Sequence, residues 1–109
     1  RYLINATNIP SPHMMVGFET TELGRRELRA AIHPVDKTVR PQILRHVDNP
    51  RYHRVISRFE ELTGIGAVLN TSFNLHGEPV VCSPSDAIAT LVRSGLRRLA
   101  IGPFVISKR

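Results

Sequence analysis

The clearest pattern of apolar and polar positions along the chain predicts a helix from about Pro50 to Leu62. Asn49 is a suitable N-cap, Pro50 suits the first helical position, and Gly64 is placed to end the helix in a left-handed conformation. Apolar side chains recur at the spacing of one helix face, at Tyr52, Val55, Ile56, Phe59 and Leu62. We expect this face to be buried.

The stretch CSPSDAIATLVRSG predicts a second helix. Ser83 is a suitable N-cap, Pro84 occupies the first helical position, and Asp86 lies near the positive end of the helix dipole. Gly95 follows the last periodic residue and is expected to stop the helix. The apolar stripe of this helix consists of Ala87, Ile88, Leu91 and Val92.

The remaining segments predict short strands. Residues 27–35 have the mixed apolar content of a half-buried strand that Pro34 would end, and residues 65–70, IGAVLN, suit an interior strand. LRRLAIG and FVISK predict two strands joined by a tight turn at Gly102 and Pro103, whereas VDKTVRPQ has the character of a turn or loop. This order of elements predicts an α/β or α+β fold with helices packed on a mixed sheet.

The first 24 residues differ from the rest of the chain. Pro10, Pro12 and Gly17 interrupt them, so we expect residues 1–24 to form an irregular or partly extended lead-in. The chain begins at Arg1 rather than at a methionine, and we therefore expect further sequence upstream. At 109 residues the chain is one domain at most, which we place at residues 25–109.

Small polar side chains alternate with larger ones in LNTSFNLHGEPVV, residues 69–81. On a strand, Asn70, Ser72 and Asn74 would share one face while Phe73 and Leu75 turned toward the core. Hydroxyl and amide groups offer uncharged donors and acceptors for a nucleotide or phosphoanhydride, and the glycine that follows lets the backbone approach closely. The alternative is that these residues build an Asx-type turn at a strand end.

The net charge of +6 indicates an anionic partner. Nearly all of the positive charge is arginine, which suits forked recognition of phosphate and carboxylate, although arginine bias also follows genome composition. The basic residues are scattered and only six aromatic residues accompany them, so nucleic acid is a poor fit. Arg40, in the segment predicted as a loop, is either a solvated charge or a clamp for a phosphate.

Several classes of site find no support in the sequence. Cys82 is the only cysteine, which excludes an internal disulfide and a four-cysteine zinc site. The five histidines lack metal-ligand spacing, and no nucleophile-and-base pair is recognisable, so we assign neither a metal nor a catalytic residue to this chain. No apolar run approaches the length of a membrane span and no signal peptide is evident, so we expect a cytoplasmic protein without membrane association.

Three stretches together carry a family resemblance: VDKTVRPQ, NPRYHRVISRFEELTG, and LNTSFNLHGEPVVCSPSDAIATLVRSGLRRLAIGPFVISK. They resemble the C-terminal region of the ATP-dependent O-carbamoyltransferases, a family that includes nodulation-factor and antibiotic-tailoring enzymes. The likeness covers about residues 27–108. The NTSFN-x-x-G-E-P-V-V stretch and the P-x-D-A helix that follows it are the most specific part.

The resemblance implies a two-module enzyme. This chain would be the later part of a YrdC/Sua5-like domain, a twisted mixed sheet with packed helices, which makes carbamoyl-adenylate from carbamoyl phosphate and ATP with Mg²⁺. An ASKHA-like N-terminal domain holding iron or another divalent metal would then transfer the carbamoyl group to an acceptor hydroxyl. The favoured acceptor is a nodulation-factor chitooligosaccharide, and an aminoglycoside or other antibiotic is the alternative.

The resemblance also implies site residues. Ser72 and Asn74 match an S-x-N element that contacts nucleotide phosphates, and Asn70 shares their predicted face. Arg40 matches the arginine of a D-x-T-x-R-P-Q segment and would bind phosphate or carbamoyl phosphate. One departure concerns His33, which stands one position further from Asp36 than in the family's H-V-D-G-T pattern.

A second departure is that a basic segment expected upstream of this module would precede Arg1, so we expect little activity from these residues alone. Two other functions compete with the enzyme module: a YrdC-like domain that binds RNA or nucleotides, and a non-catalytic interaction domain. Homodimerisation is left open.

Overall fold

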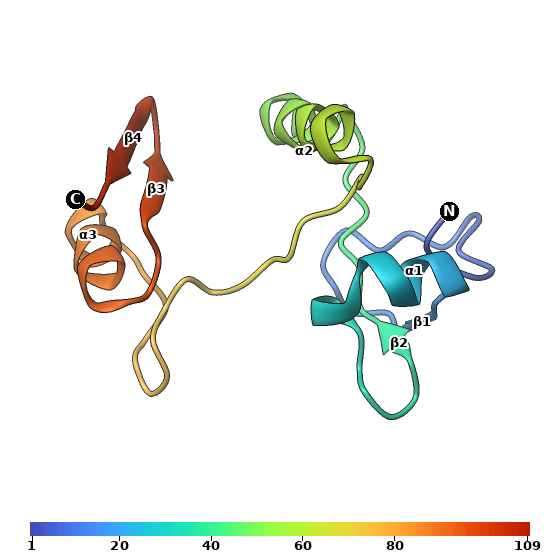
Figure 1. Cartoon of the computed structure of the whole chain (residues 1–109). Helices are drawn as coiled ribbons and strands as arrows, with labels where there is room; N and C mark the ends of the chain where they lie inside the picture. Colours follow the sequence, from blue (N-terminus) through green and yellow to red (C-terminus); the bar gives the residue numbers. More distant parts are fainter. The chain divides into compact units, whose positions relative to one another are not determined.

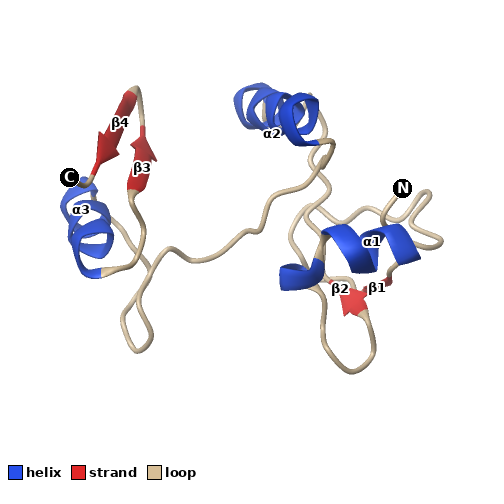
Figure 2. Cartoon of the chain, in the orientation of Figure 1, coloured by secondary structure: helices blue, strands red, loops and turns tan.

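A computed structural model describes all residues from 1 to 109, which form two compact units, Arg1–Leu69 and Asn70–Arg109. Figure 1 labels the helices and strands, and Figure 2 separates helices, strands and loops by colour. Each unit has its own two-stranded antiparallel sheet. No helix of the chain combines the length and the apolar content needed to cross a membrane.

The first unit is organised around a small pair of strands. β1 (Phe18–Glu19) pairs with β2 (Thr38–Val39), with Phe18 opposite Val39. Both of these side chains are buried, and the neighbouring Thr20 is completely buried, with its hydroxyl donating to the Lys37 carbonyl at 2.6 Å. This small apolar contact holds β2 against β1, directly before Arg40.

Helical structure replaces the strand expected at residues 27–35. α1 (Glu22–Glu27) begins at Thr21, whose hydroxyl accepts from the Gly24 N–H at 3.1 Å, and the short 3₁₀ helix η1 (Arg29–Ala31) follows. The prediction was wrong because the strong N-cap and the alanines favour helix, and no strand lies beside the segment to pair with it. The predicted boundary at residue 24 lies within α1.

α2 (Pro50–Thr63) confirms the helix predicted from the capping signals. The Asn49 side chain accepts from the Tyr52 N–H at 3.1 Å, and Gly64 ends the helix with a φ of 77°. The expectation that this apolar face is buried was wrong: contacts within this chain leave most of its side chains exposed. Leu62 is 70% exposed, and Tyr52, Val55 and Phe59 are also exposed.

The second unit contains α3 (Pro84–Arg93) and a hairpin of β3 (Arg98–Ile101) and β4 (Phe104–Ser107). Ser83 and Asp86 form the reciprocal hydrogen bonds of a capping box at the start of α3. The hairpin predicted around Gly102 and Pro103 is confirmed, with Ile101 opposite Phe104.

The end and the packing of α3 differ from expectation in two details. The helix ends one residue before Gly95, at the C-cap Ser94, whose N–H donates to the Thr90 carbonyl at 2.9 Å. Of its apolar stripe, Ala87 and Leu91 are buried, whereas Ile88 and Val92 are exposed.

The helices and antiparallel strands together confirm the α+β class. The strands form two separate antiparallel pairs rather than the expected mixed sheet. One reason is that residues 65–77, where an interior strand was predicted, contain no strand.

Candidate functional site

The predicted phosphate-binding residues of the second unit lie on a loop, residues 70–78, which we call the 70–78 loop. Phe73 has a φ of 49° and Gly77 a φ of 82°, both in the left-handed region. Side chains alternate between two faces only while successive residues keep extended dihedrals, so Phe73 removes the predicted alternation. The prediction that Asn70, Ser72 and Asn74 share one face of a strand was wrong.

Local hydrogen bonds build this loop. The Ser72 hydroxyl donates to Asn74 Oδ1, and Asn74 Nδ2 donates to the Glu78 carbonyl at 2.6 Å and, more weakly, to the Leu75 carbonyl at 3.4 Å. The Glu78 N–H donates to the Leu75 carbonyl at 3.0 Å. Asn74 therefore organises a turn, which is the alternative that the sequence left open.

The loop is joined to α3 by an ion pair. Glu78 Oε1 lies 2.5 Å from Arg93 Nη1, and the Glu78 side chain is the less exposed partner. At the start of α3, the Ser83 side chain, together with the Cys82 and Ser83 N–H groups, lowers the pKa of Asp86. These contacts place the 70–78 loop beside a capped helix within the second unit.

Arg40 belongs to the first unit, whereas Asn70, Ser72 and Asn74 belong to the second. Arg40 directly follows β2, is exposed, and makes no hydrogen bond or ion pair within the chain. A guanidinium in this state is available to an anion from solution. The structure brings Ser72 and Asn74 into contact, and Asn70 makes a polar or electrostatic interaction of its own.

The segment before Arg40 is a tight turn, residues 33–38, which we call the 33–38 turn. Asp36 Oδ1 accepts from the Thr38 N–H at 2.9 Å and from the Thr38 hydroxyl at 2.7 Å, and His33 Nδ1 lies 3.1 Å from the same oxygen. The Thr38 backbone N–H is the main cause of a lowered pKa at Asp36. Sequence reasoning missed this arrangement, although the D-x-T spacing was a signal for it.

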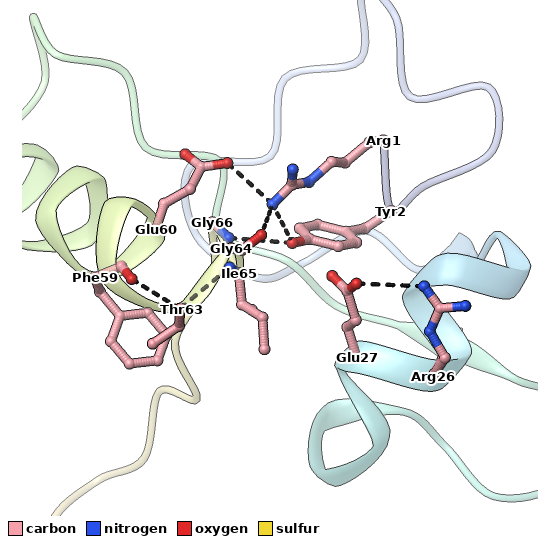
Figure 3. Close-up of polar contacts among 10 residues, drawn as sticks. All are labelled: Arg1, Tyr2, Arg26, Glu27, Phe59, Glu60, Thr63, Gly64, Ile65 and Gly66. Carbon is pink, nitrogen blue, oxygen red and sulfur yellow. Dashed lines mark hydrogen bonds and ion pairs between the residues drawn. The ribbon is translucent and has the colours of Figure 1, made fainter.

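A polar cluster in the first unit fixes the chain where it leaves α2 (Figure 3). Arg1 Nη2 donates to the Gly64 carbonyl at 2.5 Å and to the Tyr2 hydroxyl at 2.6 Å, and it lies 3.0 Å from Glu60 Oε1. The Tyr2 hydroxyl accepts from the Gly66 N–H at 3.1 Å. The chain after α2 is therefore held by its own N-terminal residues.

Two shallow hollows in the first unit contain none of the four predicted ligands. Pro12, His13 and Asp48 contribute to one, and Ile4, Val16 and Phe18 to the other. No group of three histidine, cysteine, aspartate or glutamate side chains gathers as a metal site would require.

Comparison with known proteins identifies the class of the domain. The family described as "Carbamoyltransferase C-terminus" matches residues 2–108. The chain therefore belongs to the carbamoyltransferase family, as a C-terminal region, and the resemblance inferred from its motifs is confirmed.

Individual relatives agree with this assignment. The chain is 43% identical to the uncharacterized protein MJ1051 of Methanocaldococcus jannaschii, over 98% of this chain and 20% of that protein. It is 46% identical to the nodulation protein NolO of Bradyrhizobium diazoefficiens, over 72% of this chain and 14% of the relative. It is also 36% identical to the 3'-hydroxymethylcephem-O-carbamoyltransferase of Amycolatopsis lactamdurans, over 69% and 14% of the respective chains. The chain thus spans a fifth or less of the length of these relatives.

Proposed function

We propose that the full-length protein is an O-carbamoyltransferase and that this chain is part of the module that forms carbamoyl-adenylate from ATP and carbamoyl phosphate. The observation that carries this proposal is the family match over residues 2–108. Two relatives are named for nodulation and for carbamoylation of a hydroxymethylcephem, which supports transfer to a hydroxyl group. A sugar-type acceptor such as a nodulation factor is favoured, and an antibiotic is the alternative.

Arg40 is the proposed ligand of carbamoyl phosphate or of a nucleotide phosphate. Its exposed guanidinium has no partner in the chain, so it forfeits no internal ion pair when an anion binds. Two parallel N–H donors match two phosphate oxygens, which makes such a contact stronger than one with a single donor.

Ser72 and Asn74 are the proposed ligands of the nucleotide phosphates, with Asn70 beside them in the sequence. The Ser72 hydroxyl is exposed and now donates to Asn74 Oδ1. Because a hydroxyl hydrogen rotates freely, it can turn from Asn74 to a phosphate oxygen without a change in the backbone. Asn74 keeps the loop in shape through the Glu78 carbonyl, and its second Nδ2 hydrogen, which donates only at 3.4 Å to the Leu75 carbonyl, is the donor available to a phosphate oxygen.

The reaction needs positioning and charge stabilisation rather than a covalent catalyst. Water cleaves carbamoyl phosphate to carbamate and phosphate, and a carbamate oxygen then attacks the α-phosphorus of ATP as pyrophosphate leaves. Fixed donors at the phosphate oxygens stabilise the negative charge that develops. The Mg²⁺ enters with ATP, and an iron or other divalent ion belongs to the N-terminal transfer domain. These substrates favour a cytoplasmic location.

The test is carbamoyl-adenylate formation by the full-length protein, followed by mass spectrometry and by pyrophosphate release. Arg40→Ala or Ser72→Ala should each lower kcat/KM by about 100-fold, the loss typical of removing one donor to a developing anion. Arg29→Ala and Ser107→Ala are matched controls, since both residues are solvent-exposed and neither side chain makes a hydrogen bond or ion pair in the chain. Unchanged rates in both site variants would refute the site assignment.

A further inference from the structure

The 33–38 turn ends two residues before Arg40, and hydrogen bonds link the two ends of the turn. The His33 N–H donates to the Thr38 carbonyl at 2.8 Å, and the Lys37 N–H donates to the His33 carbonyl at 3.1 Å. The two ends of the turn are therefore tied together by the backbone itself. Arg40 is two residues beyond Thr38, so the turn controls the backbone from which the guanidinium projects.

Asp36 is the centre of this turn. One oxygen, Oδ1, faces the Thr38 N–H, the Thr38 hydroxyl and the His33 ring nitrogen. Two donors from Thr38, with the His33 ring nitrogen beside them, hold the side chain in one orientation. The shift of His33 by one position away from Asp36 along the sequence therefore does not separate the two side chains in space.

The backbone of the turn is strained at Lys37, whose φ is 60°. Glycine adopts a positive φ without a steric penalty, whereas lysine does so only at a cost. Two hydrogen bonds stabilise Lys37 in this conformation. The Thr20 hydroxyl donates to the Lys37 carbonyl, and the Lys37 ammonium group donates to the Pro34 carbonyl. The contacts of Asp36 and Thr38 help to hold this unfavourable conformation.

We propose that Asp36, supported by His33, is a positioning residue for Arg40: it fixes the 33–38 turn and thereby holds the guanidinium where it meets the phosphate of carbamoyl phosphate. This inference rests on the proposed function. Asp36 does not contact the anion, because its carboxylate is negative. Asp36 acts by fixing Thr38, the first residue of β2. Thr38 pairs with Glu19 of β1 and lies two residues before Arg40.

The test is a double-mutant cycle in the full-length protein with ATP, Mg²⁺ and carbamoyl phosphate. Arg40→Ala should raise KM for carbamoyl phosphate by about 100-fold, and Asp36→Ala should raise it by about tenfold with a smaller change in kcat. In the Arg40→Ala background, Asp36→Ala should change KM less than about twofold, because a residue that acts through another has no effect once that residue is gone.

Two further variants keep the test decisive if Asp36→Ala folds poorly. Thr38→Val removes only the hydroxyl contact and suits a strand, so it should raise KM about threefold while the protein stays folded. Asp36→Asn retains an acceptor for the Thr38 N–H, so its KM for carbamoyl phosphate should lie between those of the wild type and Asp36→Ala. Asp48→Ala is the control, since it removes an aspartate that pairs with Arg45 in another exposed turn of the same unit.

The outcomes separate the two proposals. If Arg40→Ala raises KM but the Asp36 and Thr38 variants do not, or if their effects add to that of Arg40→Ala, the positioning role is refuted and the proposed function stands. If Arg40→Ala itself leaves KM unchanged, the assigned role of Arg40 is wrong and the positioning role falls with it.

Discussion

The 33–38 turn with β2 and the 70–78 loop are opposite cases of how this chain forms its polar segments. Thr38 and Val39 were expected in a loop, yet they form a strand because Phe18 and Glu19 lie alongside. The segment around Ser72 was expected to be a strand, yet it forms a turn stabilised by its own side chains. Strand formation in this protein depends on a partner segment rather than on local alternation.

The largest expected effect concerns the contact that makes β2 a strand. Phe18→Ala should lower the free energy of unfolding by about 3 kcal/mol, because it removes a buried aromatic ring opposite Val39. It should also increase hydrogen exchange at residues 38–40. The comparison variant is Val80→Ala, beyond the 70–78 loop, where an exposed side chain is lost at little cost. Equal losses in the two variants would contradict the distinction between the two regions.

The two long helices provide the second comparison. Leu91 of α3 is 2% exposed, whereas Leu62 of α2 is 70% exposed. Leu91→Ala should therefore cost about 2–3 kcal/mol in urea unfolding and Leu62→Ala less than about 0.5 kcal/mol. A similar cost at both positions would mean that α2 packs against a surface outside the contacts described here.

The third comparison tests the backbone of the 70–78 loop directly. Phe73 has a positive φ, so Phe73→Gly should be more stable than Phe73→Ala by about 1 kcal/mol, the reverse of the order in a strand. Lys37→Gly in the 33–38 turn should be stabilising for the same reason. Thermal unfolding of the wild type and of these three variants measures both effects. If Phe73→Ala is the more stable of its pair, the loop is extended in solution.

The smallest expected effect is the pH dependence of two carboxylates, one in each unit. Hydrogen bonds lower the pKa of Asp36 and of Asp86 in the folded state. A lowered folded pKa means that the stabilisation is present above the unfolded value of about 3.9 and is lost as the pH falls through the folded value. Asp36→Asn and Asp86→Asn should each make stability less dependent on pH below about 4, as measured by urea unfolding.

Local signals in the sequence predicted α2, α3 and the hairpin well, but not α1. Asn49 and Gly64 mark the ends of α2 as expected, and Ser83 with Asp86 marks the start of α3, because capping depends on residues only a few positions apart. The pairing of β1 with β2 joins segments about twenty residues apart through the burial of Phe18, so no local pattern could show it.

The candidate site was predictable in part. The sequence singled out Arg40, which the structure shows exposed and free of internal partners. It also singled out Ser72 and Asn74, which are in contact but through a turn rather than a strand face. The hydrogen bonds of Asp36 to Thr38 were missed although the D-x-T spacing is a local signal for them. The positive φ of Lys37, which completes the turn, is visible only in the structure.

The most direct test of the central claim is a crystal structure of the full-length protein bound to carbamoyl-adenylate. The account predicts the Ser72 hydroxyl within about 3 Å of a phosphate oxygen, with residues 70–78 keeping the turn around Asn74. It also predicts that, in crystals with carbamoyl phosphate, the Arg40 guanidinium lies within about 3 Å of a phosphate oxygen. Ligands bound well away from both residues would contradict the account.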